Sequence, residues 1–145
     1  MLMLVRGIPG SGKSTFVKKN YPQFLHLEND MFHIDGEGHY CFDRRRQDEA
    51  VSWCLEMAEL ALSRGVSVVV SNTFTKRKYL RPYIDLAERY GHEHAVVRIE
   101  TYYGSVHDVP EEVVESMKRG FEDCEGETVV SKSDTVPPPN PRWLI

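Results

Sequence analysis

Short apolar runs alternate along the chain with longer amphipathic segments. Four runs have the length and apolar content expected of strands: residues 2–5, 24–28, 66–70 and 93–100. Four segments carry apolar residues at helical spacing: residues 13–19, 47–63, 79–90 and 111–121. Gly65 and Gly91 end the two longest helical patterns. The alternation predicts a three-layer α/β/α fold, with a mostly parallel sheet of four to five strands joined by right-handed crossovers.

Length and composition fit one compact domain followed by a tail. With 145 residues, of which 41% are hydrophobic, the chain suits one core rather than two. We expect the domain to cover residues 1–125. Residues 126–145 are polar and then proline-rich, so we expect them to form an extended or disordered tail.

Charge and cysteine content narrow the function classes. The 18 basic and 22 acidic residues give a formal net charge of -4, so no overall field draws the chain to nucleic acid or to an anionic membrane. Cys41, Cys54 and Cys124 are widely spaced and lack a CxxC pair, which disfavours a disulfide framework or a zinc knuckle. The N-terminal apolar run is too short for a signal peptide or a membrane span. We therefore expect a cytoplasmic protein.

The strongest motif lies between the first predicted strand and the first predicted helix. The segment GIPGSGKS at residues 7–14 fits the pattern GxxxxGK[ST] in full. Its glycines let successive backbone N–H groups turn inward, and the helix N-terminus adds partial positive charge. The segment therefore predicts a phosphate-binding loop (P-loop) for a nucleoside triphosphate. The expected nucleotide-binding residues are Gly7, Pro9, Gly10, Ser11, Gly12, Lys13, Ser14 and Thr15.

Two side chains of the P-loop have specific expected roles. Lys13 supplies a mobile cation for the β and γ phosphates of ATP. The Ser14 hydroxyl is the expected protein ligand of Mg²⁺. The predicted cofactors are therefore ATP and Mg²⁺.

Ligands of parallel sheets bind beyond the carboxyl ends of the strands, so the residues after the other strands are the next candidates. Asp30 is the expected general base, which would take the proton of an acceptor hydroxyl; capping of the next segment is the alternative. Asn72 and Thr73 are candidates to hold the acceptor, and a turn with a helix cap is an equally weighted alternative. No acid follows the third strand, where many P-loop enzymes carry a Mg²⁺-associated aspartate.

Two basic clusters, at residues 44–46 and 76–78, are candidates to contact phosphate on the acceptor or the nucleotide. Arg44 and Arg77 represent them, and a solvated basic face is the alternative interpretation. The loop over residues 102–112 is predicted to form a lid above the site, with His107 as its candidate cation.

Four segments together resemble the small P-loop kinases of the polynucleotide-kinase-like branch, over about residues 1–122: GIPGSGKST, LEND, VVVSNTF and VPEEVVESM. The resemblance implies a parallel sheet flanked by helices. It also implies phosphoryl transfer, since the better known members phosphorylate 5′-hydroxyl ends of DNA or RNA, although many members are known only as ATP-binding proteins. By position, Lys13 and Ser14 match the family's P-loop pair, and Asp30 matches its general base.

The chain departs from this family on the acceptor side. His33 stands where the family has an arginine, and Asn72 stands where it has an aspartate. A shorter loop with His107 replaces the arginine-bearing lid. His33 thereby joins the candidate substrate contacts.

The sequence thus predicts an ATP-dependent kinase that acts on a hydroxyl. The acceptor candidates are a nucleic-acid end, a modified base, a nucleoside or nucleotide, and another small metabolite. The alternative is an NTP-binding switch that hydrolyses slowly and binds a protein partner.

Overall fold

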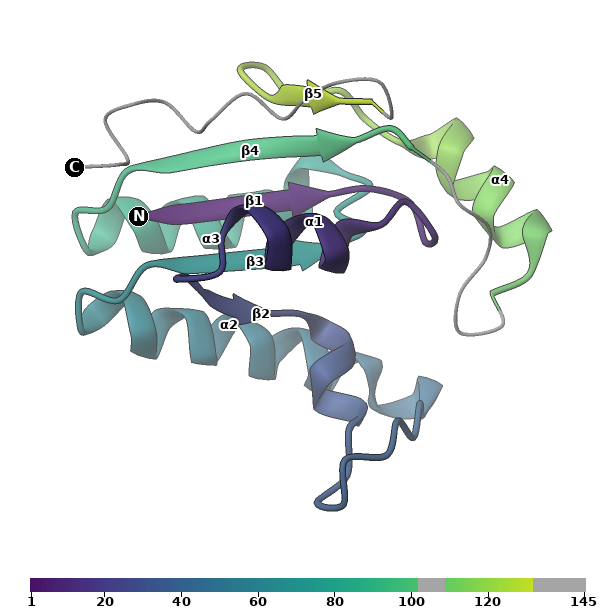
Figure 1. Cartoon of the computed structure of the whole chain (residues 1–145), viewed down its shortest axis with the longest axis horizontal. Coiled ribbons are helices and arrows are strands. Elements are labelled where there is room, and N and C mark those ends of the chain that lie inside the picture. Colours follow the sequence, from purple (N-terminus) through teal and green to yellow (C-terminus); the bar gives the residue numbers. More distant parts are fainter. Residues whose placement is uncertain (102–108, 132–145) are drawn as a thin grey trace.

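The computed structural model describes residues 1–101 and 109–131 (Figure 1). The strands within these residues are β1 (Leu2–Arg6), β2 (Leu25–Leu27), β3 (Val68–Asn72), β4 (His94–Ile99) and β5 (Thr128–Val130). They form one sheet in the order β2-β3-β1-β4-β5, and each neighbouring pair is parallel. The predicted parallel α/β architecture is confirmed.

Helices connect the strands and cover both faces of the sheet (Figure 1). They are α1 (Lys13–Asn20), α2 (Gln47–Ser63), α3 (Arg77–Arg89) and α4 (Glu111–Gly120), with short 3₁₀ turns η1 (Asn29–His33) and η2 (Arg44–Arg46). In Figure 1, α4 lies beyond the carboxyl ends of the strands. Among the described residues, no helix is long and apolar enough to cross a membrane.

Alternate side chains of β1 serve two separate cores. Leu2 and Leu4 pack with α2 and α3 on one face, and Met3 and Val5 pack with Val17 of α1 on the other. Because successive strand residues point to opposite faces, a strand covered on both sides is apolar throughout. The central position of β1 brings the P-loop, which follows it, to the middle of the sheet edge.

Two segments differ from their predicted limits. β3 begins at Val68 rather than at residue 66, because its register pairs Val68 with Leu2 and leaves Val66 43% exposed. Its carboxyl end therefore includes Ser71 and Asn72. Residues 128–130, which lie in the expected tail, pair with β4 as β5 and bury Val130, so the sheet extends past residue 125.

Arg6, the last residue of β1, is fully buried. Its guanidinium donates to the Phe74 carbonyl at 2.7 and 3.0 Å and to Glu127 Oε1 at 3.0 Å. The ring of Phe121 lies 4.3 Å from the Arg6 guanidinium carbon. These contacts fasten the segment that follows α4 to the strand that carries the P-loop. The carboxylate and carbonyl acceptors offset the cost of burying the cation.

Candidate active site

The P-loop connects β1 to α1 through two glycines in the left-handed region. Gly10 has a φ of 83° and Gly12 a φ of 86°, a conformation that side chains with a Cβ rarely adopt. Three hydrogen bonds hold the loop in place: Gly7 N–H to the Thr73 carbonyl, Ser11 N–H to the Ile8 carbonyl, and the Thr101 hydroxyl to the Ser11 carbonyl. The loop is therefore anchored to the ends of β3 and β4.

Gly7 is required by close packing rather than by its backbone angles. A Cβ at this position would lie 2.6 Å from Ser11 Oγ and 3.1 Å from the Ile99 carbonyl oxygen. Ser11 is itself 1% exposed, and its hydroxyl has no hydrogen-bond partner among the described residues. An unsatisfied buried hydroxyl inside the loop is suited to an oxygen-rich ligand.

The first turn of α1 offers backbone donors and two functional side chains. Gly12 caps the helix without a side-chain hydrogen bond, and the first turn contains no acidic residue. The N-terminal N–H groups and the helix dipole therefore favour an anion here. Lys13 donates to the Ile8 carbonyl at 3.1 Å, which folds its ammonium back over the loop. Pro9 lies within the loop, and Thr15 is exposed on α1.

The structure adds Glu28, which sequence reasoning did not select. The Ser14 hydroxyl donates a hydrogen bond to Glu28 Oε1, and the Ser71 hydroxyl donates to the same oxygen at 2.8 Å. His26 Nε2 lies 2.9 Å from this oxygen and 2.8 Å from Ser71 Oγ. Three polar side chains thus converge on one carboxylate oxygen beside the P-loop serine.

The pKa values at the site follow from burial and from these contacts. Burial by itself raises the pKa of Glu28, but hydrogen bonds from His26, Ser14 and Ser71 and the charge of His26 outweigh it and lower the pKa to about 2. Burial lowers the pKa of Lys13 to about 8, against the opposing effect of the Glu28 and Asp30 carboxylates. The Lys13 side chain thus lies within the electrostatic reach of both carboxylates, Glu28 and Asp30.

Asp30, the predicted base, lies in the first turn of η1. It is half-buried, and Tyr40 OH donates to its Oδ1 over 3.4 Å. Its charge acts on Lys13, so the structure brings Asp30 to the P-loop side of the sheet edge. No hydrogen bond to Ser14 is made by Asp30 in the described part of the chain; that contact belongs to Glu28.

Asn72 and Thr73 secure the two loops that meet at this edge. Asn72 Oδ1 accepts from the Asn29 N–H at 2.9 Å, and Asn72 Nδ2 donates to Asn29 Oδ1 at 3.1 Å. The Thr73 carbonyl accepts from Gly7. The Asn72 amide is therefore engaged in fixing the segment between Glu28 and Asp30.

The other candidate substrate contacts fall in different places. His33 is 5% exposed, and its ring nitrogens lie 2.9 Å from Gln47 Oε1 and 3.4 Å from the Asp43 backbone nitrogen, so both are engaged inside the fold. Arg44 is exposed; its carbonyl accepts from the Gln47 N–H, and its side chain makes no ion pair or hydrogen bond with any described residue. His107 lies outside the described residues.

Exposed aromatic rings stand beside Asp30. Tyr40 is 39% exposed and Phe42 is 54% exposed. Their planes are 16° apart, with 6.5 Å between the ring centroids, and the Phe42 ring also packs on the His33 ring at 4.9 Å. A bridge between Ile34 and Tyr40 holds the hairpin that carries them. The Tyr40 side of this hairpin thereby lies beside the predicted base.

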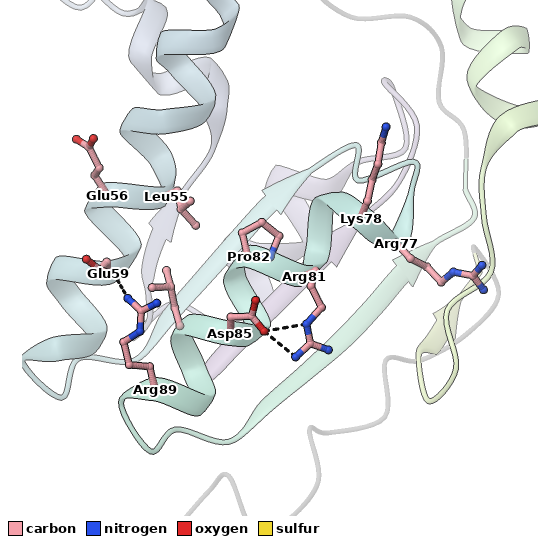
Figure 2. Close-up of a pocket in the computed structure, with 10 residues that line it drawn as sticks. Leu55, Glu56, Glu59, Arg77, Lys78, Arg81, Pro82, Asp85 and Arg89 are labelled. Atoms are coloured by element: carbon pink, nitrogen blue, oxygen red, sulfur yellow. Dashed lines mark hydrogen bonds and ion pairs between the residues drawn. The ribbon is translucent and has the colours of Figure 1, made fainter.

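Arg77 and Lys76 are turned toward α4 rather than toward the P-loop. The Arg77 N–H donates to Glu122 Oε1 at 2.8 Å, and Lys76 Nζ donates to the Gly120 carbonyl at 2.5 Å. The Arg77 side chain lines a groove of about 760 Å³ between α2 and α3 (Figure 2). Figure 2 shows that Arg81 and Arg89 in this groove pair with Asp85 and Glu59. The groove shares no residue with the P-loop and is a separate surface.

Comparison with known proteins shows the family to which this chain belongs. A family model described as an AAA domain matches residues 2–124. The chain belongs to this AAA domain family. This chain is 29% identical to an uncharacterized protein of Pasteurella multocida, and the match covers 80% of this chain and 73% of that protein.

Solved structures share the fold of this AAA domain chain. A sugar kinase from Janibacter sp. HTCC2649 superimposes with a TM-score of 0.65 at 18% identity, covering 92% of this chain and 86% of that chain. Chaetomium thermophilum Kti12, in complex with ADP-AlF3, superimposes with a TM-score of 0.63 at 11% identity, covering 94% and 92% of the two chains. The fold is that of the small P-loop kinases.

Proposed function

We propose that this protein is a Mg²⁺- and ATP-dependent phosphotransferase that acts on a hydroxyl group. The observation that carries the proposal is the meeting of two groups of residues at one edge of the sheet. Lys13, Ser14 and the N–H groups of the P-loop form a polyphosphate cradle on one side. Asp30 stands on the other side, close enough for its charge to act on Lys13. The solved structures of this fold include a sugar kinase, which is consistent with such chemistry.

The residues of the P-loop suit an ATP·Mg²⁺ ligand. The left-handed backbone at Gly10 and Gly12 and the N-terminal N–H groups of α1 suit phosphate oxygens. The Ser14 hydroxyl is a hard oxygen donor of the type that Mg²⁺ accepts, and Lys13 is the mobile cation. When bound, the metal ion would neutralise charge on the phosphate oxygens.

The half-buried position of Asp30 supports its role as the general base. Its carboxylate would accept the proton of the acceptor hydroxyl, whose oxygen forms the new bond to the γ-phosphorus while the bond to the ADP oxygen breaks. Tyr40 donates to Asp30 Oδ1, so the hydroxyl of Tyr40 would orient the carboxylate. Burial raises the pKa of Tyr40 to about 12, with the Asp30 charge acting in the same direction, and this keeps the donor protonated.

On the acceptor side, we propose a hydroxyl carried by a nucleoside or by a nucleic-acid end. Tyr40 and Phe42 expose aromatic surface beside Asp30, and such surface stacks well on a nucleobase. Arg44, two residues beyond Phe42, is exposed and unpaired among the described residues, and could meet a backbone phosphate. The resemblance of the LEND segment to polynucleotide kinases points in the same direction.

Transfer of a radiolabelled γ-phosphoryl group from ATP tests the proposal. The acceptors to compare are DNA and RNA oligonucleotides with 5′-hydroxyl ends, nucleosides, and a simple sugar acid. Asp30→Asn should lower the rate of transfer to the true acceptor by about 10²- to 10⁴-fold. Glu37→Gln, which removes an 83% exposed carboxylate from the same hairpin, is the matched control and should leave the rate unchanged. Slow hydrolysis with no transfer to any acceptor would instead favour a nucleotide-dependent switch.

A further inference from the structure

No acid follows β3 in this chain, but a carboxylate that follows the neighbouring strand β2 lies beside the P-loop serine. Asn72 ends β3, and its amide is bonded to Asn29 rather than to the P-loop. β2 pairs with β3 in parallel, with Leu27 opposite Val70, so the residue after Leu27 stands beside Ser71. That residue is Glu28, and the Ser14 hydroxyl donates to its Oε1.

We infer that Glu28 is the carboxylate of the metal site, acting with the Ser14 hydroxyl to hold the Mg²⁺ ion of the bound nucleotide. This assignment rests on the proposed function and adds a residue to it. A serine hydroxyl and a carboxylate in direct contact at a P-loop form a pair of hard oxygen donors, which is the donor chemistry that Mg²⁺ selects. Glu28 would act directly or through a water molecule on the ion.

The surroundings of Glu28 hold its carboxylate in one orientation. The Ser71 hydroxyl donates to Oε1, and His26 Nε2 lies within hydrogen-bond distance of both Oε1 and Ser71 Oγ. The side chains of His26 and Glu28 are 15% and 18% exposed, which limits their freedom. Partners of this kind commonly orient the carboxylates that bind metal ions. His26 and Ser71 are thus positioning residues.

The other acid at this edge has a different environment. Asp30 is bonded to Tyr40 and faces the exposed rings of the hairpin, whereas Glu28 faces the P-loop serine. The two carboxylates of the LEND segment are therefore divided between two tasks. Glu28 serves the metal ion, and Asp30 serves the acceptor hydroxyl.

Binding of Mn²⁺ in the presence of a non-hydrolysable ATP analogue tests this assignment. The electron paramagnetic resonance signal of free Mn²⁺ gives the affinity of the metal ion for the complex without any turnover. We expect Glu28→Gln to weaken Mn²⁺ binding by at least tenfold, and Asp30→Asn to leave it within about threefold of the wild type. The affinity for the nucleotide in excess chelator should change little in either variant.

Ser71→Ala separates a metal role from a purely structural one. It removes one hydrogen bond to Glu28 but leaves the carboxylate in place, so it should lower stability while weakening Mn²⁺ binding much less than Glu28→Gln does. Equal Mn²⁺ affinity in Glu28→Gln and the wild type would overturn the assignment. So would losses of Mn²⁺ affinity in Glu28→Gln and Ser71→Ala that are proportional to the losses of stability in these two variants. Either result would leave the kinase proposal standing, whereas failure of the wild type to bind the nucleotide would remove it.

Discussion

Glu28 should also contribute a measurable, pH-dependent part of the folding free energy. Its pKa lies at about 2 in the folded protein against an ordinary value of 4.5, which corresponds to about 3 kcal/mol of stabilisation at neutral pH. Because the folded-state pKa is the lower one, this stabilisation is complete above pH 4.5 and is lost as the pH falls toward 2. By pH 3 about half of it should be gone.

Glu28→Gln mimics the protonated carboxyl group and so isolates this contribution. Urea denaturation of the wild type and the variant should give a difference in unfolding free energy of about 3 kcal/mol at pH 7, which narrows to between about 1 and 2 kcal/mol at pH 3. Glu37→Gln alters an 83% exposed carboxylate and is the control, for which we expect only a small difference in unfolding free energy. A Glu28→Gln difference that stays constant between pH 7 and pH 3 would refute the reasoning.

Three further predictions test other parts of the structure. Gly7→Ala should destabilise the protein by about 1 to 3 kcal/mol in urea denaturation, because its Cβ would meet Ser11 Oγ at 2.6 Å, and adding Ser11→Ala should restore part of the loss. Arg6→Met should cost about 3 kcal/mol by the same measurement, since it removes the guanidinium that pairs with the buried Glu127 carboxylate at 3.0 Å and leaves Arg98, at 3.6 Å, as the remaining cation; a smaller cost in a Glu127→Gln background would show the coupling. Phe42→Ala should raise the KM for a base-bearing acceptor about tenfold while the KM for ATP stays unchanged, so equal effects on both substrates would contradict a stacking role.

Much of the fold could be predicted from the sequence because its signals are local. The apolar run of β1, the GxxxxGK[ST] loop and the helical spacing of α2 each identify an element without knowledge of the rest of the chain. The limits of β3 could not be predicted in this way. Residues 66–70 are valines except for Ser67, and the pairing with β1 decides that the strand begins at Val68. β5 was not predicted either, because residues 128–130 lie at the start of a polar and proline-rich segment and form a strand only by pairing with β4.

In the candidate site too, some residues could be predicted from the sequence and others could not. The P-loop motif alone predicts the roles of Lys13 and Ser14, because the motif is a short segment of backbone that carries its own conformational signal in Gly10 and Gly12. Asp30 was selected separately, because it follows the second predicted strand. The sequence could not show which carboxylate of LEND meets Ser14, because this depends on the register of β2 beside β3 and on the distance across the sheet edge.

His33 is a residue that the sequence suggested for the site but that the fold places elsewhere. Its place in the sequence made it a candidate substrate contact, but the fold buries it between Gln47 and the backbone of Asp43. The sequence by itself determined the order of β1 to β4 and α1 to α4 and the P-loop that joins β1 to α1, since these are encoded by neighbouring residues. The tertiary structure decided which side chains from different strands face one another, because those contacts depend on strand register and packing between segments far apart in the chain.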